Sequence, residues 1–305
     1  MTKRLGTGDY QYEAIEDWAG ITIPGVASGV ASDSKGKVYV ATRTNQSFDN
    51  CTGAILVFDE HGKFLHAFGG EKLGTPHHIT VGPEDEIFHT DCQDHTVRKY
   101  STSGELLMVL GTPGQPGLPD APFNQPTCAV RSPKSGDIFV SDGYRQSRIH
   151  RFTSDGELVL SWGKGDLNLY DQEVHNSTAT PGTGPGEFNC PHGLTVDNED
   201  RVYVQDRGNN RIQIFDNQGN YLSEWEIPSP NQSVIDDDGL IYTASGGQVR
   251  ISNYEGEHLA AWGERGPESW QFTGGAHGLC LDNNAGALYV SQVGAENGLN
   301  KFVRV

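Results

Sequence analysis

The sequence predicts an all-β protein built from six copies of one four-stranded unit. Short runs of aromatic and β-branched residues recur along the chain, and Gly, Asp and Asn interrupt them. The 39 glycines among 305 residues exceed average usage, as expected for a chain with many tight turns. One unit also returns six times with variations, and its consensus is an apolar run, Asp-x-x-Gly, a hydrophobic-Tyr/Phe-Val segment, Arg-Ile-x-x-Phe, and a segment that ends in Trp-Gly.

Each copy contains four alternating segments separated by turns, which is typical of one blade of a β-propeller. The copies extend over residues 22–70, 71–112, 123–164, 187–228, 229–264 and 272–305. The last copy lacks its fourth segment, and residues 10–21 supply it, with Trp18 at the place of the Trp-Gly ending. Because such closure removes an exposed sheet edge, the sequence predicts a six-bladed β-propeller. We expect a single domain over residues 1–305, with the N-terminal strand closing the last blade.

Two connections are longer than the others and are rich in Pro, Gly and Asn, at residues 111–126 and 163–191. Such segments are surface loops and not linkers between domains. They precede the inner strands of blades three and four. We therefore expect them to wall a site on one face of the propeller.

Charge and composition limit the classes of partner. The formal net charge is −18, which argues against nucleic acid or an anionic membrane as a partner. The first 20 residues contain no apolar core of a secretory signal, and no stretch reaches the length of a membrane helix. The five cysteines are scattered and odd in number, so we expect no disulfide framework and a cytoplasmic location.

Three histidines occupy one equivalent place, at the start of the inner strand of blades two, four and six. They are His77, His192 and His277. Imidazoles that converge from alternate blades would form an open metal site, with zinc as the first candidate and another transition metal as an alternative. His78, His89 and His95 compete as ligands. The structural alternative is that a histidine at a strand start only hydrogen-bonds a neighbouring blade.

Two arginines and a tyrosine end the second strands of three blades and can face the same end as the histidines. Arg43 and Arg207 suit a substrate carboxylate, because guanidinium groups bind carboxylates in a bidentate manner. Tyr144 is a candidate base. The structural alternative for Arg207 is a turn salt bridge with Asp206.

These residues resemble a known family. The repeats are similar to NHL repeats, and the chain resembles the peptidyl-α-hydroxyglycine α-amidating lyases, six-bladed propellers of that class. The stretches TPHHITV, FNQPTCAVRSPKSGDIFVSDGYRQSRI and GPGEFNCPHGLTV carry this resemblance, together with HGLCLD. It spans nearly the whole chain and is strongest over residues 123–212.

The resemblance implies a zinc site at His77, His192 and His277, a base at Tyr144, and carboxylate binding by Arg43 and Arg207. The implied reaction splits the N–C bond of a carbinolamide into an amide and glyoxylate. The family also has a structural calcium, for which Val30 and Ile79 match the carbonyl positions. Gly278 stands in place of the family's aspartate, which argues against calcium. Ala276 replaces a pocket methionine, so the substrate can differ, for example as a smaller α-hydroxy acid.

Two other functions compete with the lyase. One is a non-catalytic NHL propeller that binds a protein partner across one face. The other is a lactonase-type six-bladed hydrolase, which needs Glu, Asn and Asp where this chain has histidines. The lyase interpretation requires a small substrate with a carboxylate and leaves the oligomeric state open.

Overall fold

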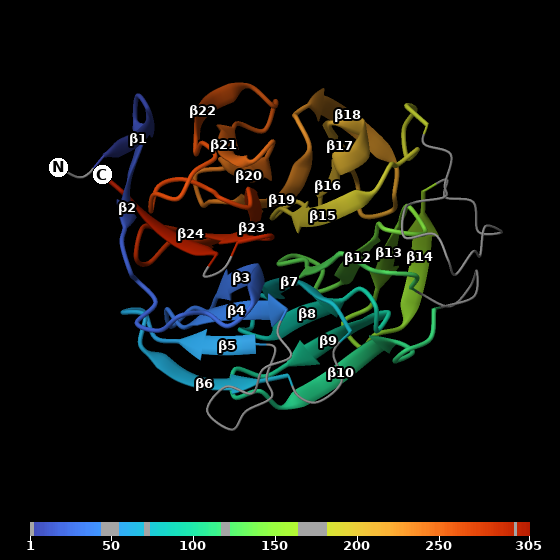
Figure 1. The fold of residues 1–305 in the computed structure, drawn as a ribbon. Coiled ribbons are helices and arrows are strands. Elements are labelled where there is room, and N and C mark those ends of the chain that lie inside the picture. The colour runs from blue at the N-terminus through green and yellow to red at the C-terminus, as the bar shows by residue number, and fades with distance from the viewer. Residues whose placement is uncertain (1–2, 44–54, 70–73, 117–122, 164–181, 296–297) are drawn as a thin grey trace. The chain divides into compact units, whose positions relative to one another are not determined.

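The computed structural model describes residues 3–43, 55–69, 74–116, 123–163, 182–295 and 298–305. In these ranges the chain forms 25 β-strands, arranged as six sheets, and one short 3-10 helix (Figure 1). The strands of five sheets are neighbours in chain order, as in the blades of a propeller. The predicted six-bladed β-propeller fold is confirmed. The parts of the two long connections at residues 117–122 and 164–181 lie outside the described residues.

The chain divides into two compact units with three sheets each, here called the first unit (Met1–Lys72 and Asn231–Val305) and the second unit (Leu73–Pro230). The first sheet of the first unit contains β3 (Val26–Ser32), β4 (Val38–Arg43), β5 (Ile55–Phe58) and β6 (Phe64–Phe68). Its second sheet contains β19 (Pro230–Ile235), β20 (Ile241–Ser245), β21 (Gln248–Ser252) and β22 (His258–Trp262). Its third sheet contains β23 (Ala276–Asp282), β24 (Ala287–Gln292) and β25 (Leu299–Arg304), which are joined by β2 (Tyr10–Ile15) and β1 (Arg4–Thr7).

The second unit contains the middle three blades. Its first sheet contains β7 (Pro76–Val81), β8 (Ile87–Asp91), β9 (Thr96–Tyr100) and β10 (Leu106–Gly111). Its second sheet contains β11 (Cys128–Arg131), β12 (Ile138–Asp142), β13 (Arg148–Phe152) and β14 (Leu158–Trp162). Its third sheet contains β15 (Pro191–Val196), β16 (Val202–Asp206), β17 (Arg211–Phe215) and β18 (Tyr221–Glu226). The 3-10 helix η1 (Arg207–Asn209) follows β16.

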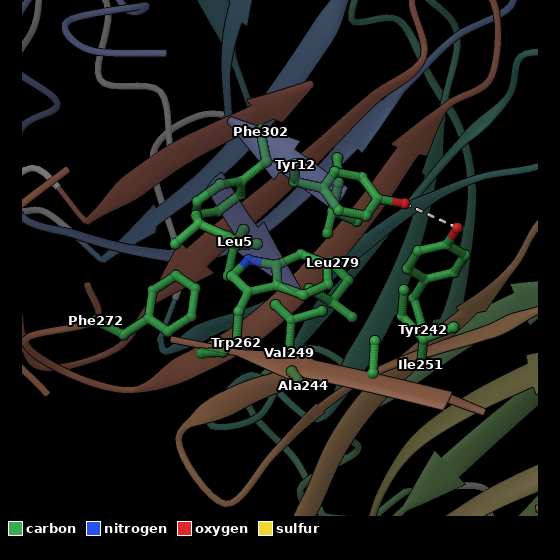
Figure 2. Close-up of a cluster of buried hydrophobic side chains, with 14 of the residues drawn as sticks. Leu5, Tyr12, Tyr242, Ala244, Val249, Ile251, Trp262, Phe272, Leu279 and Phe302 are labelled. Carbon is green, nitrogen blue, oxygen red and sulfur yellow. Dashed lines mark hydrogen bonds between the residues drawn. The ribbon is translucent and has the colours of Figure 1, made fainter. Parts of the chain in front are cut away.

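The N-terminal strand closes the last blade as predicted. Strand β2 pairs antiparallel with β25, with Tyr12 opposite Arg304. Figure 2 shows the buried cluster that this pairing completes: the Tyr12 ring stacks on Trp262 of the neighbouring sheet at a centroid distance of 4.6 Å. The Tyr12 hydroxyl donates a hydrogen bond of 3.0 Å to the Tyr242 hydroxyl. The observed strand is shorter than residues 10–21, and β1 adds a fifth strand that the sequence did not predict.

A tryptophan at the end of each of three copies packs on a phenylalanine in the third strand of the next sheet. The centroid distance is 5.9 Å for Trp162 and Phe215 and 6.0 Å for Trp262 and Phe302. Trp18 follows β2 and lies 5.8 Å from Phe58. Trp18 therefore makes the contact expected of the Trp-Gly ending that the last copy lacks.

An aspartate after the first strand builds the turn to the second strand in three of the blades. In blade four Asp197 Oδ1 accepts the backbone N–H groups of Glu199 and Arg201, and Asp197 Oδ2 accepts the Tyr203 hydroxyl at 3.0 Å. Asp33 with Tyr39 and Asp236 with Tyr242 repeat this hydroxyl contact. These aspartates therefore satisfy backbone donors that a turn leaves unpaired.

The four described cysteines are free thiols, and Cys51 lies outside the described residues. Burial raises the pKa of Cys128 and of Cys280 to about 12, so these two thiols stay protonated at neutral pH. Within the described ranges no helix is both long and apolar enough to cross a bilayer.

Candidate functional site

A β-bulge places the predicted histidines. In β15 Pro191 lies opposite Asp206 and Gly193 opposite Gln205, so His192 is an extra residue between two paired positions. The same shift surrounds His277 in β23 and affects β7 between Pro76 and Ile79, where His77 lies. A bulge interrupts the strict alternation of side chains and re-aims the extra residue, which explains why bulges are frequent beside active sites.

In the second unit two of these histidines and the predicted tyrosine meet. His77 and His192 are fully buried, and their ring centroids lie 4.6 Å apart. The Tyr144 hydroxyl lies 2.9 Å from His77 Nε2 and 3.1 Å from His192 Nε2. Both Nε2 atoms therefore face one oxygen atom, which is the convergence that the repeat positions predicted for these two residues.

Backbone carbonyl groups determine which ring nitrogen of His77 and of His277 carries the proton. His77 Nδ1 lies 2.6 Å from the carbonyl oxygen of Thr127, in the neighbouring blade. Because a carbonyl oxygen only accepts, Nδ1 carries the proton and Nε2 of the neutral ring keeps its lone pair. In the first unit His277 Nδ1 donates in the same way to the Ser28 carbonyl at 2.8 Å. The hydrogen bond to a neighbouring blade and a ligand role at Nε2 are thus compatible.

Arg207 begins η1, directly after β16, and lies beside the tyrosine. Its guanidinium carbon is 5.6 Å from the centroid of the Tyr144 ring, and Nη2 donates to Cys190 Sγ at 3.1 Å. The buried Asp206 carboxylate instead accepts Arg211 Nε at 2.8 Å. The turn salt bridge suggested for Asp206 and Arg207 is therefore formed by Asp206 and Arg211.

Cys190 is a residue of this site that the sequence did not single out. It has a left-handed backbone with φ 58°, directly before Pro191 and His192. Burial raises the pKa of the Cys190 thiol, and the Arg207 guanidinium offsets part of that increase. Its place before the Pro-His step was the available signal, but cysteine alone is usually a buried apolar residue.

The remaining two predicted site residues belong to the first unit. Arg43 ends β4 and pairs with Val26, and His277 is 7% exposed in β23. The structure thus brings together His77, His192, Tyr144 and Arg207 in the second unit, while roles for Arg43 and His277 stay predictions from the sequence.

The close surroundings of Gly278 explain why no aspartate follows His277. A Cβ atom added to Gly278 would lie 2.6 Å from Ser291 Oγ and 3.1 Å from the Cα of Gly29. The second contact is with backbone, which cannot move aside cheaply. A side chain at this position would therefore crowd Ser291 and the backbone of Gly29, and the absence of calcium stays an expectation from the sequence.

The comparisons with known proteins agree with the repeat and the fold. Residues 188–215 match the NHL repeat model. The chain is 34% identical over 296 residues to human NHL repeat-containing protein 3, covering 90% of this chain and 78% of the relative. It is 30% identical over 300 residues to the Drosophila melanogaster peptidyl-alpha-hydroxyglycine alpha-amidating lyase 1, covering 90% of this chain and 51% of that relative. It is 33% identical over 232 residues to the rat peptidylglycine alpha-amidating monooxygenase, covering 68% of this chain and 22% of that relative.

Two solved structures share the fold at low sequence identity. A streptogramin B lyase has a TM-score of 0.61 and 15% identity, covering 97% of this chain and 99% of that chain. A gluconolactonase from Xanthomonas campestris has a TM-score of 0.65 and 14% identity, covering 98% and 91%. These structures support the fold alone.

The fold and the repeat define an NHL-repeat β-propeller with a buried histidine and tyrosine cluster in its second unit. The chain belongs to the NHL-repeat family that includes NHL repeat-containing protein 3, and its resemblance to the amidating lyases is confirmed. It spans about half the length of the fly lyase (51%) and about a fifth of the rat monooxygenase (22%).

Proposed function

We propose that this protein is a metal-dependent lyase that cleaves the N–C bond of a carbinolamide acid of the α-hydroxyglycine type, or of a related small α-hydroxy acid. The observation that carries the proposal is the Tyr144 hydroxyl between two histidine Nε2 atoms, at 2.9 and 3.1 Å, with a guanidinium beside the tyrosine ring. The relatives named as amidating lyases support the same reaction class.

The donor set fits a transition metal. His77 and His192 are buried imidazoles, and the carbonyl contact at His77 Nδ1 leaves the lone pair of Nε2 facing the Tyr144 hydroxyl, where an ion could bind. These two residues would hold the ion, with His277 as the third ligand predicted from the sequence and zinc as the first candidate. When bound, such an ion polarises substrate oxygens as a Lewis acid.

The residues of the chain have distinct tasks in the proposed reaction. Arg207 binds the substrate carboxylate through charge-assisted hydrogen bonds, and Arg43 is its predicted companion. Tyr144 acts in its phenolate form, and its Oη takes the proton of the substrate hydroxyl group as the carbon–oxygen double bond forms and the C–N bond breaks. The same proton then passes to the leaving amide nitrogen, so that an amide and glyoxylate result.

A non-catalytic propeller that binds a protein partner is the second candidate. The observation in its favour is that a relative with 34% identity is named for its repeats alone. This candidate does not require the tyrosine hydroxyl to meet two buried imidazoles. We also propose a small carboxylate substrate and a reducing compartment such as the cytoplasm, in keeping with free thiols at the described cysteines.

Metal analysis combined with a glyoxylate-release assay tests the proposed function. We expect about one transition-metal ion per chain and release of glyoxylate from an N-acyl α-hydroxyglycine. Changing His192→Ala should remove the metal and the turnover while the fold is kept. Changing the exposed His258→Ala is the matched control and should alter neither. Purified protein without metal and without glyoxylate release would favour the binding propeller.

A further inference from the structure

His78 departs from the repeat at a defined position. In the other two copies that carry a predicted metal histidine, the residue after the histidine is glycine, at Gly193 and Gly278. Blade two has His78 in this place, and the side chain is 1% exposed. Blade two therefore places a buried imidazole beside the bulge, where the other two copies have no side chain.

The three imidazoles of the second unit are mutual neighbours. The ring centroid of His78 lies 4.4 Å from that of His77 and 5.2 Å from that of His192, and the third distance, between His77 and His192, is 4.6 Å. The ring planes cross at 72°, 90° and 69°. These rings meet edge to face, and none of the three pairs is stacked.

A ring nitrogen of His77 and a ring nitrogen of His78 lie within 4.8 Å of each other, as ligands of one metal ion must, and the ring spacings agree with a shared ion. With metal–nitrogen bonds of about 2.0–2.1 Å, each ring centroid lies about 3.2 Å from the ion. Two such rings are then about 5 Å apart at a tetrahedral angle and about 4.5 Å apart at a right angle. The observed values of 4.4, 4.6 and 5.2 Å cover this interval.

We infer that His78 is a further ligand of the metal that His77 and His192 bind. This inference rests on the metal site of the proposed function and adds a ligand to it. An additional nitrogen ligand is compatible with four-coordinate zinc and also suits ions that accept five or six ligands, such as cobalt, nickel or iron. It also reduces the number of positions open to water or substrate.

Cobalt binding to the full-length protein and its variants tests the inference. His78→Phe keeps a ring of similar size without nitrogen, and His78→Gly restores the residue found in the other copies. We expect both variants to bind Co²⁺ at least tenfold more weakly than the parent. Their visible absorption should also change, because it reports the number of ligands. His61→Ala is the control, since the His61 side chain is 83% exposed in a turn.

X-ray absorption of the Co²⁺-loaded parent protein and of Co²⁺-loaded His78→Phe gives a second measurement. One imidazole nitrogen fewer is expected around the ion in the variant, and equal numbers in the two proteins would overturn the inference. Unchanged Co²⁺ affinity and absorption in His78→Phe would overturn it as well. A parent protein that binds neither Co²⁺ nor Zn²⁺ would refute the metal site itself, which is a distinct result.

Discussion

Removing the Tyr144 hydroxyl tests the proposed chemistry most directly. Tyr144→Phe deletes one oxygen atom that contacts His77 Nε2 at 2.9 Å and His192 Nε2 at 3.1 Å. One hydroxyl proton serves one Nε2 atom at a time, and the net loss of one hydrogen bond should lower the free energy of unfolding of the metal-free protein by about 0.5–1.5 kcal/mol. Loss of a positioned acid–base group lowers the rate about 10²- to 10⁴-fold, equivalent to about 3–5 kcal/mol of barrier.

Tyr203→Phe is the matched control in the same unit. Its hydroxyl donates to Asp197 in the turn between β15 and β16, away from the histidines. This variant should lose comparable stability but retain its rate of glyoxylate release. Metal content should be unchanged in both variants, because neither removes an imidazole. Equal turnover of the two variants in single-turnover assays would refute the role assigned to Tyr144.

Three further predictions follow from particular contacts. Changing Arg207→Met should raise KM for the carboxylate substrate about tenfold to a hundredfold, with a smaller effect on kcat, because a hydrogen bond to a charged group contributes about 1.5–3 kcal/mol. An unchanged KM in steady-state assays would exclude carboxylate binding by this residue. Changing Trp18→Ala should cost about 2–3 kcal/mol in urea unfolding, because the half-buried ring contacts Phe58 and Tyr289. Ile15 is 41% exposed, so the control change Ile15→Ala should lower the free energy of unfolding by less than about 1 kcal/mol. Equal losses of stability in the two variants would contradict the closing role of Trp18. Burial lowers the pKa of His89 to about 4, with Asp91 opposing and Arg98 adding to this shift. The unfolded chain binds the proton near pH 6.5, so stability should decrease by up to about 3 kcal/mol as pH falls from about 6.5 to 4. Valine stands at the equivalent positions of the next two blades, Val140 and Val204, so His89→Val is the matched change and should make this decrease smaller. If thermal melts of the variant depend on pH as steeply as those of the parent, the acid sensitivity belongs to other groups.

The repeat made much of the fold and site predictable. Six copies with equivalent positions identify which strands are equivalent, and the incomplete last copy indicates that the N-terminal segment must pair with it. Equivalence also selected His77 and His192 before any coordinates, because two residues at the same place in different copies occupy the same place in different blades. Trp18 was predicted in the same way and contacts Phe58 as its counterparts contact theirs.

Other features of the site depend on contacts that no local pattern encodes. The proton of His77 is assigned by a carbonyl 50 residues away, at Thr127. The choice of Arg211 over Arg207 as partner of Asp206 depends on which guanidinium reaches the buried carboxylate. The packing of the His78 ring against His77 and His192 depends on the bulge in β7, since strict alternation would direct adjacent side chains to opposite faces.

The amino-acid sequence by itself determined the number of blades, the closing strand and the residue types at the strand starts. The physical reason is that strand periodicity and turn chemistry are local and repeat with the copy. Only the tertiary structure decided which atoms of those side chains meet, namely two Nε2 atoms at one phenolic oxygen and a guanidinium at a thiol. Hydrogen bonds and ring contacts act over about 3–6 Å, so their partners are set by the pairing and bulging of strands far apart in the chain.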